Sequence, residues 1–87
     1  MNETIQLFIN NIDDSMADQI LIDQTIQAMN EKLEMKRAQD RSGWQSSKCS
    51  NDILKQMLLK HIEKGDMIDV INIAAMIMVR EKIYGKD

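Results

Sequence analysis

The residues of this 87-residue chain that are best suited to chemistry are two carboxylates and an amide in its C-terminal part. Asp66 and Asp69 are three residues apart, and Asn72 follows three residues later. Side chains at this spacing are neighbours on a helix, so their oxygen atoms would share one edge. A carboxylate pair of this kind can hold Mg²⁺ when further oxygen ligands complete the octahedron. Capping of a helix N-terminus explains the same two aspartates without a ligand, and we favour that interpretation.

A magnesium site would need more carboxylates than these two. Glu31 and Glu34 have the same spacing and would complete a set of four ligands with Asp66 and Asp69. His61 is the only histidine, and its residue type would suit a proton shuttle. Because no nucleophile accompanies it, we favour a position in the last turn of a helix, where its charge would meet the helix dipole.

Other reactive groups are scarce. Cys49 is the only cysteine, so an intramolecular disulfide is excluded and a cysteine-based metal site is unsupported. The chain has no glycine-rich phosphate loop, no Ser-His-Asp grouping and no Cys-x-x-Cys pair. We therefore expect a protein that is not an enzyme and uses no cofactor, with Mg²⁺ as the alternative.

The elements that must position these residues are all predicted to be helices. Apolar residues recur at steps of three and four along most of the chain, which is the period of an amphipathic helix. This pattern predicts a single all-α domain over 1–87, a helical hairpin or small bundle of three main helices plus a short N-terminal helix. The predicted segments are a short helix over 3–12, a long helix over 15–38, a loop over 39–50, and helices over 51–64 and 66–84.

Polar residues mark the expected helix ends. Asp14 or Ser15 would cap the long helix, and Asp18 stands three residues after Ser15, as in a capping box. Gly65 would end a helix in the left-handed conformation, and Asp66 would cap the next helix at once. The helices over 51–64 and 66–84 should therefore form an antiparallel hairpin with a very short turn.

The helix predicted over 66–84 is apolar on nearly all sides. Between Met67 and Val79 only Asp69 and Asn72 are polar. Such a helix is surrounded by others or is shared between chains, and a domain of this length buries only about 60% of its unfolded surface. We expect at least a homodimer with its interface on this helix. The candidate interface residues are Met67, Val70, Ile71, Ala74 and Met78.

The net charge of −3 hides an asymmetry along the chain. Residues 1–31 carry six acidic and no basic side chains, whereas residues 32–64 carry eight basic and four acidic ones. The acidic part would face a basic partner, pack on the basic part of this chain or of a second copy, or form the solvated face of a helix. We favour the solvated face. The candidate partner-binding residues are Asp13, Asp14, Asp18, Asp23 and Trp44.

Trp44 and the overall composition narrow the functional classes further. Trp44 is the only tryptophan and is expected to anchor loop 39–50 on the helices. The acidic balance and the presence of only three aromatic residues argue against a general nucleic-acid binder. A leader peptide and an apolar run of about 18 residues are both missing, so we expect a protein of the cytoplasm with no membrane segment.

The C-terminal half of the chain resembles a module of small bacteriophage and prophage accessory proteins. The resemblance rests on Gly43-Trp44, on Cys49, and on the run His61-Ile-Glu-Lys-Gly-Asp-Met-Ile-Asp-Val-Ile-Asn72 before a methionine-rich helix. It implies a phage origin rather than a particular activity. A small phage protein without a catalytic set is expected to bind a host protein and to inhibit or redirect it, and the host's antiviral defence is one class of target.

The Lys-Gly-Asp turn before Asp-Val-x-Asn is also similar to the end of MazG-like all-α nucleoside triphosphate pyrophosphohydrolases. That family binds Mg²⁺ with Glu-Glu-x-x-Glu on one helix and Glu-x-x-Asp on the next. Here the second element is present only as Asp66-x-x-Asp69, and Glu63 stands alone where the first should lie. The alternative function is therefore a nucleotide-binding or pyrophosphohydrolase module, with Glu31 and Glu34 replacing the missing element.

Overall fold

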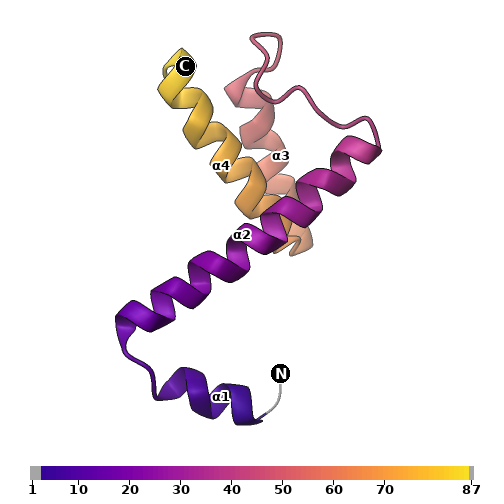
Figure 1. Ribbon diagram of the computed structural model, residues 1–87. Coiled ribbons are helices and arrows are strands. Elements are labelled where there is room, and N and C mark those ends of the chain that lie inside the picture. Colours follow the sequence, from indigo (N-terminus) through magenta and orange to yellow (C-terminus); the bar gives the residue numbers. More distant parts are fainter. Residues whose placement is uncertain (1–2, 87) are drawn as a thin grey trace.

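Four helices make up the regular structure of the protein (Figure 1). The computed structural model describes residues 3–86, and within that range all regular structure is helical, which confirms the all-α class and the short N-terminal helix. The observed ends lie within two residues of the predicted ones. The helices are α1 (Glu3–Asn10), α2 (Asp14–Ala38), α3 (Asn51–Lys64) and α4 (Met67–Tyr84).

The cap of α2 differs from the expected one. Asp13 is the N-cap, and its carboxylate accepts a hydrogen bond from the backbone N–H of Met16 at 2.8 Å. The prediction of Asp14 or Ser15 as cap, with a capping box reaching Asp18, is wrong by one or two residues. The helix begins earlier because Asp13 supplies the acceptor and leaves Asp14 in the first turn, where a negative charge also stabilises the helix dipole.

The turn between α3 and α4 is as short as the sequence predicted. Gly65 ends α3 at φ 78°, a left-handed conformation that glycine adopts without a Cβ penalty. Asp66 occupies the N-cap position of α4, but its side chain caps no backbone N–H, so the capping prediction is wrong for its side chain. The carboxylate lies instead against His61, at the end of α3.

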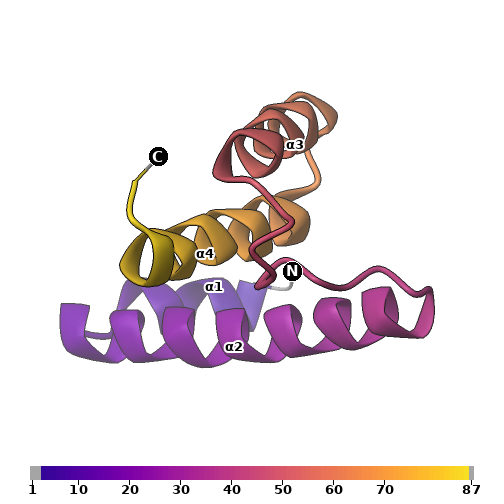
Figure 2. The same cartoon turned by 90° about the horizontal axis from the view of Figure 1, so that it is seen from above.

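Helix α4 lies between α2 and α3, as the view in Figure 2 shows. Its inner side and α3 form a small buried core of Leu54, Ile73 and Ile77, against which Cys49 and Met76 pack. The central place of α4 agrees with the expectation drawn from its apolar sequence. Within residues 3–86, every helix falls short of the length and apolar content that spanning a membrane requires.

A buried arginine holds the loop over 39–50 in place. Arg80 of α4 is only 4% exposed, and its guanidinium donates hydrogen bonds to loop carbonyl oxygens and to the amide oxygen of Asn51. The carbonyl acceptors are Trp44 at 2.6 Å, Ser46 at 2.7 Å and Cys49 at 2.6 Å. The loop is therefore fixed mainly through its backbone. Trp44 itself is half-buried and lines a small cavity with Met29 of α2 and Val79 of α4.

The N-terminal part of the chain extends away from the hairpin (Figure 1). We call residues 3–26, which comprise α1, the following turn and the first half of α2, the helical arm. Within the described residues, extensive helix-to-helix contact joins only α3 to α4 and α2 to α4, and neither α1 nor α2 contains a fully buried residue. The exposed large apolar residues of the arm are Ile5, Leu7, Phe8, Ile9, Met16, Leu21, Ile22 and Ile26.

Candidate functional site

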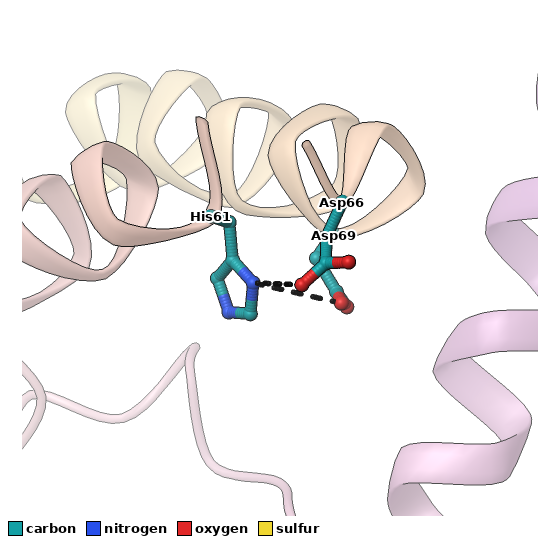
Figure 3. A group of neighbouring side chains, drawn as sticks. All are labelled: His61, Asp66 and Asp69. Carbon is teal, nitrogen blue, oxygen red and sulfur yellow. Dashed lines mark hydrogen bonds and ion pairs between the residues drawn. The ribbon is translucent and has the colours of Figure 1, made fainter. Parts of the chain in front are cut away.

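Three side chains with metal-binding or acid–base chemistry meet where α3 turns into α4 (Figure 3). His61 comes from the last turn of α3, Asp66 from the turn, and Asp69 from the first turn of α4. The His61 Nδ1 atom lies 3.3 Å from Asp66 Oδ2 and 3.7 Å from Asp69 Oδ2. The three donor atoms lie within 4.8 Å of one another. The short Gly65 turn causes this meeting, because it folds the start of α4 directly back onto the end of α3.

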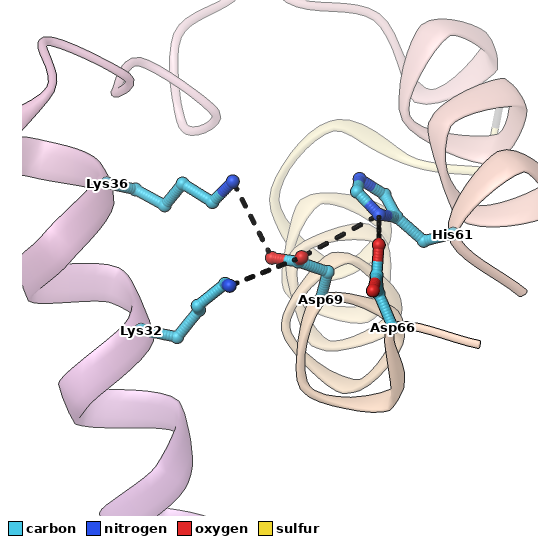
Figure 4. Close-up of polar contacts among 5 residues, drawn as sticks. All are labelled: Lys32, Lys36, His61, Asp66 and Asp69. Atoms are coloured by element: carbon cyan, nitrogen blue, oxygen red, sulfur yellow. Dashed lines mark hydrogen bonds and ion pairs between the residues drawn. The ribbon is translucent and has the colours of Figure 1, made fainter. Parts of the chain in front are cut away.

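Two lysines of α2 complete the cluster (Figure 4). The ammonium groups of Lys32 and Lys36 lie 3.6 and 3.8 Å from the two carboxylate oxygens of Asp69. Lys32 and Lys36 are one helical turn apart and so share a face of α2. Asp69 is 7% exposed and is thus a nearly buried carboxylate that links α2 to the α3–α4 hairpin. We call these five residues the Asp69 cluster.

The structure brings together only half of the magnesium ligands expected from the sequence. Asp66 and Asp69 are adjacent, but Glu31 and Glu34 are exposed, and neither belongs to a three-residue group of potential ligands within 3–86. Glu31 accepts a hydrogen bond from Gln27 on its own helix at 3.3 Å. Successive residues of a helix are rotated by about 100°, so the face that carries Lys32 and Lys36 does not carry these glutamates.

The donor set of the cluster does not fit Mg²⁺. This ion prefers several oxygen ligands in an octahedron, whereas the cluster offers two carboxylates, an imidazole and two ammonium groups. An imidazole with two carboxylates resembles a transition-metal set more closely, but the lysines already pair with Asp69 and repel a cation. The arrangement favours an internal polar link between helices, with Asp69 as its centre.

The partner-binding candidates lie in two separate places. Asp13, Asp14, Asp18 and Asp23 are all exposed on the helical arm. Trp44 is half-buried and lines a cavity with Met29, which is about 9 Å further along α2 than Asp23 by helical rise. The structure therefore groups the four aspartates on one element and leaves Trp44 outside that group.

Four of the five interface candidates lie on one side of α4. Met67, Ala74 and Met78 are exposed, while Val70 and Ile71 are half-buried. The spacing of 67, 71, 74 and 78 follows the helical period, so these four residues form one stripe along α4. Val70 lies beside the stripe rather than in it. We call these four residues the α4 stripe.

A large cavity adjoins the Asp69 cluster. It has a volume of about 840 Å³ and lies among the C-terminal half of α2, loop 39–50, α3 and α4. His61, Asp69 and Asn72 all contribute to its wall. Asn72 is buried, and its Oδ1 atom has no hydrogen-bond partner. Sequence spacing placed Asn72 near Asp69 correctly but gave no sign of the cavity.

Sequence reasoning missed the roles of Lys32, Lys36 and Arg80. Two lysines one turn apart, on either side of Leu33, were the available signal that this face of α2 would meet a carboxylate. Arg80 donates hydrogen bonds to the loop through its guanidinium. Its position at the end of a long apolar run was the signal for a buried role.

Comparison with known proteins adds nothing to this geometry. No family model, no curated protein and no solved structure matches the chain. The phage and MazG-like resemblances therefore stay predictions.

Proposed function

We propose that this chain is a non-enzymatic, phage-encoded interaction protein that binds a host protein through the helical arm, in the host cytoplasm. The observation that carries the proposal is the arm itself, on which eight large apolar side chains are exposed and no residue is fully buried. Apolar surface of this extent is typical of a protein–protein interaction site. On the host side, proteins of the antiviral defence are the proposed class of target.

The size of the molecular surface supports a binding role. The chain exposes 6909 Å², whereas a compact monomer of this mass exposes about 5,300 Å². Its radius of gyration is 15.8 Å, against about 12 Å for a compact domain of this length. The excess surface of about 1,600 Å² is enough for two interfaces of standard size, at about 800 Å² per partner each.

Charge defines the chemistry of the partner. Residues 3–26 contain five acidic side chains and no basic one. Asp14 and Asp18 are exposed beside the apolar side chains, while Asp13 is held as the cap of α2. A complementary partner has a basic rim around an apolar groove, because opposite charges speed association and reject other partners. Proteins that bind nucleic acid carry basic surfaces of this kind.

The alternative, a magnesium-dependent nucleotide enzyme, has less support. It needs about four carboxylates around the metal, and lysines occupy the side of Asp69 that faces α2. The ion pairs of Asp69 with Lys32 and Lys36 link α2 to the hairpin, and this structural role explains them without a metal ion. We therefore keep the interaction protein as the proposal.

Substitution of Phe8 by glutamate is expected to weaken partner binding at least tenfold without a change in thermal stability. Phe8 is 52% exposed on a helix without a buried residue, so its loss removes apolar contact area for a partner and disturbs little internal packing. Tagged protein would be incubated with host lysate, and the stoichiometric partner would then be purified and titrated by calorimetry. Gln6→Glu on the same helix adds the same charge and is the matched control. Equal affinity of the Phe8 variant and the wild type would contradict the arm as the binding surface.

The α4 stripe is the proposed surface for self-association, and it supplies the second of the two interfaces. Substitution of Met78 by glutamate is expected to convert a dimer of about 20 kDa, twice the chain mass of 10.1 kDa, into a monomer. Met78 is 52% exposed, so the change should act on the interface and not on the fold. Light scattering during size exclusion measures the mass. A wild-type chain that is monomeric at high concentration would exclude this interface.

A further inference from the structure

The cavity beside the Asp69 cluster has the size and lining of a small-molecule site. Its volume of about 840 Å³ falls in the range of roughly 300 to 1,000 Å³ that ligand pockets occupy. Its apolar wall is built from α2, α3 and α4. The apolar wall residues are Leu33, Leu54, Met57, Ile73 and Met76. Trp44 adds a flat aromatic face on the loop side.

Positive charge surrounds this apolar wall. Arg37, Arg41 and Lys48 line the cavity, and within residues 3–86 none of the three takes part in an ion pair. Lys36 also lines it, but its ammonium group faces Asp69. Asp69 is the only carboxylate among the described lining residues. Three cations without a counter-ion beside an apolar cavity define a place for an anion.

The wall also holds one polar atom that lacks a partner. Asn72 is 4% exposed, and its side-chain Oδ1 accepts no hydrogen bond. This oxygen is itself covered from solvent, so a ligand in the cavity does not reach it, and recognition rests on the apolar wall and the cations.

We propose that this cavity binds a small organic anion with an apolar, flat body. The body lies against Trp44 and the aliphatic wall, and the anionic group meets Arg37 and Arg41. A bare inorganic anion would leave the apolar wall in water, and a neutral apolar molecule would leave the cations unpaired. The proposal is independent of the helical arm, because none of the cavity's lining residues belongs to residues 3–26.

The test uses 5-aminonaphthalene-1-sulfonate, which has an anionic group, a flat body and a hydrogen-bond donor. Trp44 is the only tryptophan, so its indole N–H gives one signal in a nitrogen–proton correlation spectrum, and this signal reports on the cavity wall. We expect a saturable shift of this signal. Binding should be at least tenfold weaker for inorganic sulfate and for 1-naphthylamine, which each lack one part of the ligand. Naphthalene-1-sulfonate, which lacks the amine but keeps the anionic group and the flat body, should bind about as tightly as the aminosulfonate.

Substitutions separate the cavity from general charge attraction. Arg37→Ala with Arg41→Ala should weaken binding of the aminosulfonate at least tenfold. The matched control is Lys55→Ala with Lys60→Ala, which removes the same charge from exposed positions of α3 outside the cavity and should leave affinity unchanged. Equal loss in both double variants, equal affinity for sulfate, or no saturable shift would overturn the proposal. All four substituted residues are exposed, so both double variants are expected to fold.

Discussion

Substitution of Arg80 by alanine is expected to lower the free energy of unfolding by about 4 kcal/mol. The side chain is 4% exposed and donates four hydrogen bonds, three of them to loop carbonyl oxygens. Alanine would leave these acceptors without a donor and would open a hole beside Tyr84, whose ring lies 4.8 Å from the guanidinium carbon. Urea denaturation followed by circular dichroism measures the loss. Because small domains have about 5 kcal/mol in total, about 1 kcal/mol would remain, which corresponds to roughly 15% unfolded protein at 25 °C.

Two further substitutions show that the effect belongs to the guanidinium and not to a positive charge as such. Arg80→Lys keeps the charge but offers one nitrogen in place of a planar fork, and we expect it to cost about 2 kcal/mol. Arg37→Ala removes an exposed arginine and should change stability by less than about 0.5 kcal/mol. If Arg80→Ala and Arg37→Ala had the same small effect, the network would not hold the loop.

Substitution of Asp69 by alanine is expected to cost about 2 kcal/mol and to loosen α2 from the hairpin. The carboxylate is nearly buried and faces two lysines whose side chains are 29% and 24% exposed. Without it these ammonium groups stay close together and half-buried, with no counter-ion. Faster amide hydrogen exchange in the C-terminal half of α2 would show the loosening, and urea denaturation would give its free energy.

The neighbouring carboxylate provides the control for this prediction. The side chain of Asp66 is 48% exposed and has His61 as its polar partner, so Asp66→Ala should cost about 0.5 kcal/mol. A double-mutant cycle of Asp69→Ala with Lys36→Ala should give a positive coupling energy, because the two side chains share one interaction. If both variants lost the same free energy of unfolding, the ion pairs between Asp69 and α2 would contribute no more than the exposed contact of Asp66.

Most of the fold was predictable because its signals are local. The left-handed conformation of Gly65 and the short α3–α4 turn depend on residues close together in the chain. The structure contains both features. The cap of α2 was misplaced because Asp13, Asp14 and Ser15 are all good caps. Which of them is used depends on backbone conformation, which composition does not determine.

The candidate site was predictable only as far as the hairpin reaches. His61, Asp66 and Asp69 lie within nine residues, so one turn brings them together. Lys32 and Lys36 precede Asp69 by more than thirty residues, and their approach to it depends on how α2 crosses α4. The same holds for Arg80, whose acceptors lie 29 to 36 residues earlier. Tertiary packing fixes these pairings, and a single sequence carries no direct record of it.

The order of the elements along the chain has a consequence for biosynthesis. The helical arm is translated first, whereas α4, on which α2 packs, begins about 40 residues after the arm ends. At typical elongation rates the ribosome needs on the order of 2 to 8 s for that distance. During this interval α4 does not yet exist, so α2 has no helix to pack on. The packing of α2 therefore waits until the whole α3–α4 hairpin has been made, although α2 precedes the hairpin in the chain.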